Sequence, residues 1–178
     1  MAEREIIQLG NQVLWEKSRE IEDCSARLCQ SLVQDLSETL QAFRQRTGYG
    51  RGIAAPQINS LHRVIFIRMQ PTGFCGALIN PRISWASDQS MELWDDCFSF
   101  PELMVLVRRS FSVSVDYKDE RGLSRSINAE GALSELLQHE IDHLDGVLAI
   151  DRAVGPHSLM TRAEWERQRA ARPFFEHA

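Results

Sequence analysis

The chain has 178 residues, of which 43% are hydrophobic and 25% are charged, and its formal net charge is −5. This composition excludes a disordered chain and suits a single globular domain spanning residues 1–178. The negative charge gives no electrostatic reason to expect a nucleic acid or an anionic membrane as a partner. Because we find no secretory signal and no apolar run near the roughly 20 residues of a membrane span, we expect a cytoplasmic protein.

Two helices are predicted near the ends of the chain. Over residues 25–46, leucines and a phenylalanine recur at spacings of three and four, and Asp23 or Ser25 can cap the start. A capping-box pattern predicts a second helix over residues 161–172, which Pro173 would stop. Its interleaved arginines and glutamates indicate a face exposed to solvent.

The middle of the chain is strand-like. Runs of β-branched residues, or apolar and polar residues in alternation, predict extended segments bounded by turns. These predicted strands cover residues 64–69, 77–79, 83–85, 105–107, 110–117 and 124–128. Because the strands follow one another with little alternation with helices, the pattern predicts an α+β protein.

A third predicted helix covers residues 128–144, with Asn128 as its N-cap and Gly146 just beyond its end. It contains the stretch QHEIDHLDG, in which His139 and His143 are four residues apart. On a helix, this spacing puts both imidazoles on one face, where they can reach one metal ion. Glu140 lies beside that face, where a general base for hydrolysis would stand.

A metal site needs a further protein ligand. A metalloprotease pattern that places a third histidine six residues after His143 is excluded, because Ala149 stands there. Another protease class takes a glutamate from a following helix, as Glu164 or Glu166 could be. Cys97, in WDDCFSFPEL, is the other candidate, because a thiolate with two imidazoles suits Zn(II) or Fe(II). We interpret the stretch around Cys97 as a polar turn.

The stretch GRGIAAPQ, residues 50–57, lacks the third glycine of a dinucleotide-binding loop and the lysine of a phosphate-binding loop. Its glycines let a backbone run close to a ligand. Gln57 ends the stretch with a neutral amide that can donate to a developing oxyanion. A tight turn between helix and strand is the simpler alternative.

Taken together, GRGIAAPQ, DDCFS and QHEIDHLDG resemble the three ordered motifs of the peptide deformylases. That family carries a G-φ-G-φ-A-A-x-Q loop, an E-G-C-φ-S turn and Q-H-E-x-x-H-φ-x-G on a helix, where φ is apolar. The resemblance implies the deformylase α+β fold, with strands packed around the metal-binding helix. It also implies release of formate from the N-terminal formyl-methionine of peptides, with transient ribosome contact as a further expectation.

The resemblance further implies roles for individual residues. Glu140 would be the general acid and base, and Gln57 with the backbone N–H of Phe98 would stabilise the oxyanion. The metal would be Fe(II), with Zn, Ni or Co as alternatives. Its implied ligands are Cys97, His139 and His143. The implied substrate-binding residues are Gly50, Arg51, Gly52, Asp96 and Arg109, with Arg109 supporting the site.

The chain departs from the family motifs at two positions. Arg51 replaces an apolar residue, and Asp95-Asp96 replaces Glu-Gly. We expect Asp95 to pair with Arg109, and Glu135, one turn before His139, to face the cleft. Arg51 could recognise a carboxylate or phosphate of a small N-formyl substrate. Alternatively, Arg51 and Asp96 pair with each other or face water.

Three other functions are compatible with these residues. The first is a hydrolase of a small N-formyl or N-acyl metabolite. The second is a zinc endoprotease with Glu164 or Glu166 as a ligand. The third is a metal-binding scaffold without turnover, against which the presence of Glu140 and Gln57 argues, because a structural metal site needs neither.

Overall fold

The computed structural model describes residues 3–69 and 73–171. Within these residues the helices are α1 (Arg27–Thr47), α2 (Gly131–Leu144) and α3 (Arg162–Ala171), with short 3₁₀ helices η1 (Gln12–Trp15), η2 (Ala55–Ile58) and η3 (Ala149–Arg152). The strands are β1 (Gly52–Ala54), β2 (Val64–Arg68), β3 (Cys75–Ala86), β4 (Ser90–Asp96), β5 (Leu103–Ser110), β6 (Ser112–Lys118), β7 (Ser124–Glu130) and β8 (Leu159–Thr161). The predicted α+β class is confirmed. No helix within these residues is long and apolar enough to cross a membrane.

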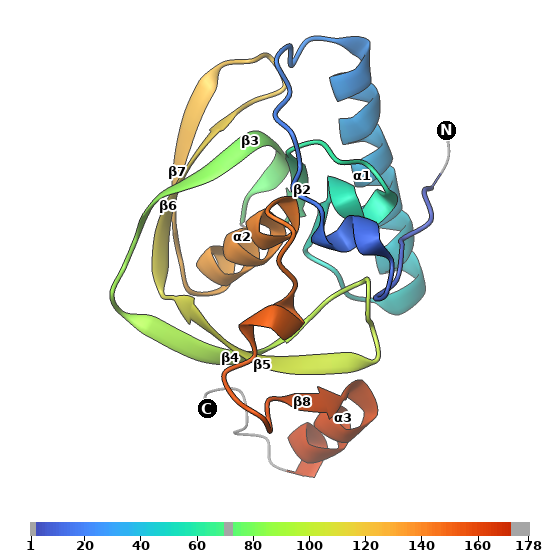
Figure 1. Cartoon of the computed structure of the whole chain (residues 1–178), viewed down its shortest axis with the longest axis vertical. Coiled ribbons are helices and arrows are strands. Elements are labelled where there is room, and N and C mark those ends of the chain that lie inside the picture. The colour runs from blue at the N-terminus through green and yellow to red at the C-terminus, as the bar shows by residue number, and fades with distance from the viewer. Residues whose placement is uncertain (1–2, 70–72, 172–178) are drawn as a thin grey trace.

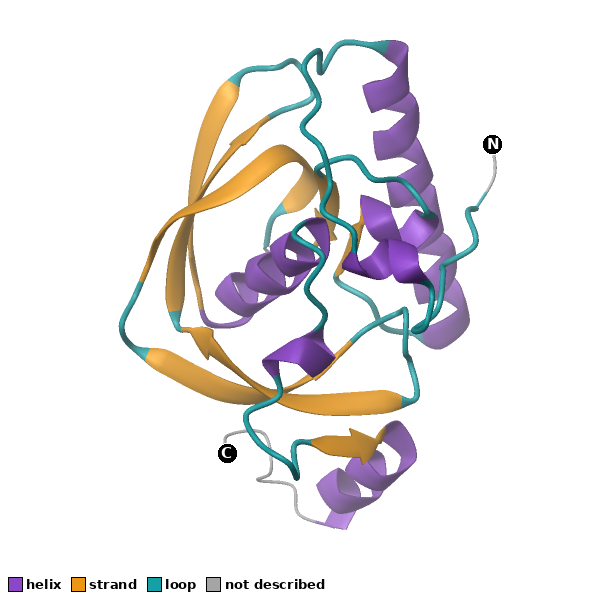
Figure 2. Ribbon diagram, viewed as in Figure 1, coloured by secondary structure: helices purple, strands orange, loops and turns teal. Residues whose placement is uncertain are grey.

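The described strands form two antiparallel sheets (Figures 1 and 2). One has the order β1-β2-β3-β6-β7 and the other the order β4-β5-β8. In Figure 1, α2 lies inside the curve made by β3, β6 and β7, and β4 and β5 pass beneath it. As a result β1 and β4, which are end strands of different sheets, both lie close to α2.

Strand β2 separates two cores. Its side chains alternate, so that Val64 and Phe66 pack in a cluster with α1 while Ile65 and Ile67 pack in a cluster with α2. Both faces of β2 are therefore buried, which explains why the run VIFI is apolar without interruption. The helix that carries the histidines is thus packed against the middle of the sheet.

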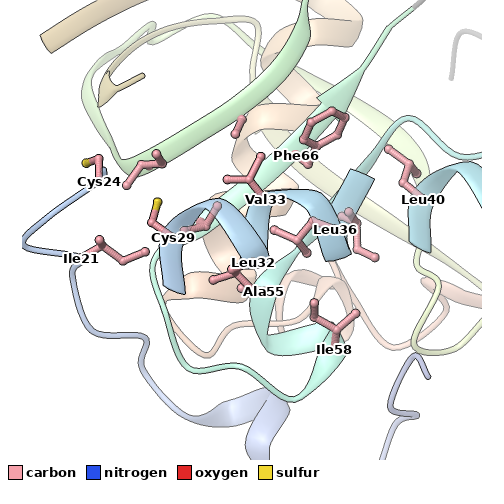
Figure 3. Packing of buried hydrophobic residues seen from close by; sticks show 14 of the residues in the cluster. Ile21, Cys24, Cys29, Leu32, Val33, Leu36, Leu40, Ala55, Ile58 and Phe66 are labelled. Atoms are coloured by element: carbon pink, nitrogen blue, oxygen red, sulfur yellow. The ribbon is translucent and has the colours of Figure 1, made fainter. Parts of the chain in front are cut away.

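Helix α1 covers the other face of the sheet (Figure 3). Its leucines at spacing four, Leu32, Leu36 and Leu40, are buried against Phe66 and Ala55, among others. Each leucine side chain that is fully buried stabilises the fold by roughly 1.5–3 kcal/mol. This stripe is the periodicity that predicted the helix.

The helix predictions are confirmed in their positions and corrected at their starts. Helix α1 has Ala26 as its N-cap, without a side-chain capping bond, because Asp23 instead accepts hydrogen bonds from Ser25. Helix α2 begins at Gly131, since Asn128 belongs to β7 and its Oδ1 accepts a hydrogen bond from the Ser114 hydroxyl. Pairing with β6 overrides the capping preference of Asn128.

Helix α3 starts at Arg162, one residue later than predicted, and Thr161 Oγ1 accepts a hydrogen bond from Glu164 N, as the capping box implies. Residue 172 and Pro173, the predicted end of this helix, lie outside the described residues.

The strand predictions are confirmed in the middle of the chain, with two corrections. The segments predicted at 77–79 and 83–85 belong to one strand, β3, whose register shifts near Asn80. The strands β1, β4 and β8 were not predicted. In particular, Asp95-Asp96 ends β4 and is not part of a polar turn, because β4 pairs with β5 along its whole length. Three residues, as in β1 and β8, are too few to show alternation, and the acidic end of β4 lacks the β-branched and aromatic residues that favour a strand.

Candidate active site

Three side chains that can bind a metal meet between α2 and the end of β4. The ligand atoms of Cys97, His139 and His143 lie within 4.8 Å of one another, and all three residues are buried. Cys97 Sγ is 3.3 Å from His143 Nε2. In the described part of the chain this is the one group of three metal-ligating side chains close enough to hold an ion. A thiolate and two imidazoles leave a fourth position open, as a catalytic site requires.

The rotation of α2 decides where its histidines point. His139 and His143 are one turn apart, on the same helical face. The side-chain amide of Gln138 fixes α2 against β5 through two hydrogen bonds. Its Oε1 accepts one from Ser110 N at 3.0 Å, and its Nε2 donates one to Ser110 O at 2.9 Å. Gly146 ends the helix with a φ of +71°, as predicted. A side chain there would collide with the Trp15 carbonyl.

Behind the ligands lies a buried set of charges centred on Asp95. His139 Nδ1 is 2.9 Å from Asp95 Oδ2, so the other ring nitrogen of His139 is left for the metal. Arg109 donates to Asp95 at 2.9 Å and to Asp142 at 2.8 Å. The predicted pairing of Asp95 with Arg109 is confirmed. Arg109 itself supports the site from behind and is not among the residues that line the cleft.

Burial sets the protonation of the ligands. Burial lowers the pKa of His143 well below its ordinary value, and the neighbouring His139 adds to the effect, so His143 is the neutral imidazole that a metal needs. Burial also lowers the pKa of His139, but the carboxylate of Asp95 outweighs it and the pKa is raised. Burial raises the pKa of the Cys97 thiol. Metal binding at Cys97 must therefore release a proton.

Glu140 is the candidate acid–base group of the site. It is buried, and its Oε2 has no hydrogen-bond partner among the described residues. Burial raises the pKa of Glu140 to about 7. A carboxyl group that titrates near neutral pH can both take and return a proton. Its free oxygen is therefore available to a water or a substrate.

Gly50, just before β1, and Gly52, its first residue, leave room for Phe98 and for this carboxylate. A Cβ on Gly52 would lie 2.5 Å from Glu140 Oε1. Gly50 has a φ of +122°, and a Cβ there would lie 2.7 Å from the Phe98 ring. The ring of Phe98 in turn stacks on Phe43, with centroids 3.9 Å apart. Close approach of backbone to side chains, and not a phosphate, explains why glycine occurs at both positions.

Gln57 stands in the short helix η2 with its amide directed at the site. Its Oε1 accepts from Ala54 N at 2.9 Å, which fixes the orientation of the amide. Its Nε2 is 3.4 Å from both Cys97 Sγ and Ser99 Oγ. The structure thus brings a neutral donor beside the metal-ligating group.

A cleft of about 590 Å³ opens over these groups. Cys97, His139, Glu140 and Gln57 all line it. Gly50, Arg51 and Gly52 form one wall, and Trp94, Asp95 and Asp96 form another. The prediction that Glu135 faces the cleft is confirmed, and Trp94 lines the cleft as well.

The charged residues at the cleft pair differently from the prediction. Arg51 does not pair with Asp96. It donates to Glu135 Oε2 at 2.8 Å and thereby links the segment before β1 to α2. The spacing of four residues between Glu135 and His139 predicted that Glu135 lies at the cleft. It did not indicate that Arg51 would be the partner of Glu135. Recognition of a substrate anion by Arg51 itself stays a prediction.

Arg162 was predicted to lie on a solvent-exposed helix face, and this prediction is wrong. Its guanidinium donates to Asp96 Oδ2 at 2.7 Å and to Pro101 O at 2.6 Å, and it lies 4.7 Å from the centre of the Tyr49 ring. The start of α3 thereby becomes part of the cleft. No sequence motif indicated this contact, since it joins residues far apart in the chain.

Glu164, the alternative metal ligand, is directed elsewhere. It pairs with Arg167 at 2.7 Å on the surface of α3. Glu166 lines the cleft but is not part of the metal-ligating group. A thiolate, two imidazoles and a buried carboxylate form the site of a metal-dependent hydrolase.

Comparisons with known proteins agree with this class. A family model described as polypeptide deformylase matches residues 3–158. Peptide deformylase 2 of Nostoc sp. is 33% identical over 173 residues, covering 90% of this chain and 92% of that protein. The crystal structure of peptide deformylase from Thermotoga maritima superposes with a TM-score of 0.79 at 28% identity, covering 87% of this chain and 100% of that one. That of a Synechococcus elongatus peptide deformylase in complex with actinonin has a TM-score of 0.77 at 29% identity, covering 96% and 86%.

The chain belongs to the peptide deformylase family. The resemblance seen in its three motifs is confirmed, and the fold is the deformylase fold.

Proposed function

We propose that the chain is a metal-dependent hydrolase that removes the formyl group from the N-terminal methionine of peptides. Water is consumed, the C–N bond of the formamide breaks, and formate and a peptide with a free amine are released. The observation that carries the proposal is the unpaired Oε2 of buried Glu140 beside the group Cys97, His139 and His143.

The three ligating side chains suit one divalent metal ion. We expect Fe(II), with Zn, Ni or Co as alternatives, because imidazole and thiolate bind all of these. When bound, the metal supplies Lewis acidity, which activates water near neutral pH. Helix α2 would then be the metal-binding helix around which the strands pack.

The remaining chemistry belongs to side chains and backbone. Glu140 takes a proton from the attacking water and delivers it to the nitrogen of the leaving amine. As the formyl oxygen becomes negative, the side-chain N–H of Gln57 and the backbone N–H of Phe98 donate hydrogen bonds to it. The amide of Gln57 is held by Ala54 N and is therefore oriented before substrate arrives.

The peptide would lie extended between the two walls of the cleft. Both β1 and β4 are end strands in the described sheets, so each has an edge that is not paired with another described strand. Such an edge can hydrogen-bond an added peptide strand. The glycines 50 and 52 let that peptide run close to the wall.

The proposal treats residues 1–178 as one catalytic domain. It also includes a cytoplasmic location and transient ribosome contact, as expected from the resemblance. Cell fractionation and co-sedimentation with ribosomes test these two parts.

The activity is tested by loading the protein with Fe(II) under anaerobic conditions and measuring formate released from a formyl-Met-Ala-Ser peptide. Glu140→Gln is the matched control, since it keeps the shape of the side chain but not the base. We expect release to fall by roughly 10²–10⁴-fold in this variant, with the metal content unchanged. A folded, metal-loaded wild-type protein that releases no formate would refute the proposal.

A further inference from the structure

One wall of the cleft carries a group of three arginines from different elements, Arg44 of α1, Arg51 before β1 and Arg68 at the end of β2. Hydrogen bonds to backbone carbonyl groups hold them together. Arg44 Nη1 donates to Gly50 O at 2.9 Å and to Arg68 O at 3.2 Å, and Arg68 N donates to Arg51 O at 2.7 Å. We call Arg44, Arg51 and Arg68 the arginine rim.

Two of these three charges are not neutralised by the protein. Arg51 pairs with Glu135. Neither Arg44 nor Arg68 forms an ion pair with a carboxylate in the part of the chain that the structure describes. The arginine rim therefore has an excess of positive charge that faces the cleft.

The opposite wall does not cancel this excess. There Asp96 is already paired with Arg162. Glu166 and Arg169 on α3 also line the cleft, and the guanidinium of Arg169 lies over the Trp165 ring. The cleft is thus cationic along β1 and β2 and close to balanced along α3.

The distance from the reacting group indicates which part of a substrate would meet the rim. Gly52 lies against Glu140, and Gly50, whose carbonyl binds Arg44, is two residues further along the wall. In extended chain this separation is roughly 6–7 Å. A peptide lying along the wall with its formyl group at Glu140 would bring its second residue to the rim.

We propose that the arginine rim binds a carboxylate carried by the second residue of the substrate. The inference rests on the proposed function and names its substrate class, short N-formyl peptides with a free C-terminal carboxylate. A guanidinium and a carboxylate make charge-assisted hydrogen bonds, which a neutral amide at the same place cannot match.

The test compares formyl-Met-Ala with formyl-Met-Ala amide as substrates of the metal-loaded enzyme. We expect kcat/KM to be about threefold to tenfold higher for the carboxylate, chiefly through KM, and the difference to shrink as salt is raised. Arg68→Gln should lower the ratio, since it removes one of the two rim cations that have no ionic partner among the described residues. Arg44→Gln should act in the same direction.

Arg121→Gln is the control, because it removes an equal charge from an exposed turn outside the cleft and should leave the ratio as it is in the wild type. Equal kcat/KM for the two substrates in the wild type would overturn the inference while leaving deformylation intact. A preference that persists in both Arg68→Gln and Arg44→Gln would also overturn it. If neither peptide releases formate, the proposed function fails, and the inference fails with it.

Discussion

At the scale of single residues, Gly52 links the glycine-rich stretch to catalysis. Its missing side chain leaves the space that Glu140 Oε1 occupies, 2.5 Å from where a Cβ would stand. We expect Gly52→Ala to displace the carboxylate and to lower kcat/KM for formate release by roughly 10²-fold, because small misplacements of a catalytic group are costly. Metal content should not change. Gly155→Ala is the control, because a methyl group there would make only an ordinary contact with Ser158 Oγ at 3.9 Å. Full activity of Gly52→Ala would contradict this account of the motif.

Removal of Cys97 distinguishes a deformylase metal site from a protease metal site. We expect Cys97→Ala to lose bound metal, since it leaves two imidazoles, whereas Glu166→Gln should keep it. Elemental analysis after gel filtration measures this directly. Cys75→Ala, an exposed cysteine far from the ligands in sequence, is the control. Metal retained in Cys97→Ala and lost in Glu166→Gln would restore the protease alternative.

The sequence predicted the metal-ligating group well because its members obey local rules. Spacing on a helix placed His139 beside His143, and motif order suggested Cys97. Apart from the pair of Asp95 and Arg109, partner choice among the charged groups could not be predicted. Asp95 contacts His139 as well as Arg109, and Arg162 reaches Asp96 from 66 residues away. Such pairs depend on tertiary packing, which no short window of sequence encodes.

At the scale of elements, the Arg51–Glu135 pair joins the segment before β1 to α2. The side chain of Glu135 is 4% exposed, while that of Arg51 is 41% exposed. Removing Arg51 would leave a buried carboxylate without its partner. We therefore expect Arg51→Leu to lower the free energy of unfolding by roughly 1–2 kcal/mol, and Arg51→Leu with Glu135→Leu to recover most of it.

Denaturant unfolding of the single and double variants measures this coupling. The exposed pair Arg108–Glu92 on β5 and β4 offers a control, and Arg108→Leu should change stability by less than about 0.5 kcal/mol. An Arg51→Leu protein as stable as the wild type would mean that Glu135 does not depend on Arg51.

The same contrast between local and tertiary rules explains the element predictions. Helix α1 was predicted because its one buried face imposes spacings of three and four on its apolar residues, and strand β2 because burial of both faces makes it a continuous apolar run. Strands β1 and β8 were missed because they have three residues each, and β4 was missed because its end, Asp95-Asp96, was interpreted as a polar turn. Since β1 and β4 form the walls of the cleft, the least predictable elements are those closest to the substrate.

At the scale of the whole molecule, the candidate metal site lies between two cores, the one that contains α2 and a second one that contains Cys97. His139 and His143 belong to α2, which packs on the five-stranded sheet. Cys97 belongs to a different cluster, with Phe100 and with Val105 of the three-stranded sheet. A metal held by all three residues would therefore join these two hydrophobic clusters. It would act in addition to the polar contacts that Asp95 and Arg109 make with α2.

This arrangement predicts that metal removal destabilises the entire fold and not only the site. A metal at 100 times its Kd adds about 2.7 kcal/mol to stability. For a chain of this length, that amounts to a fall in Tm of roughly 5–10 °C when a chelator removes the ion. Calorimetry with and without chelator measures the shift. Cys97→Ala, which lacks the ligand from the second core, should show no response to chelator. If the chelator strips the metal and the Tm of the wild type stays constant, the two cores are stable without the ion, and the role of the metal is confined to chemistry.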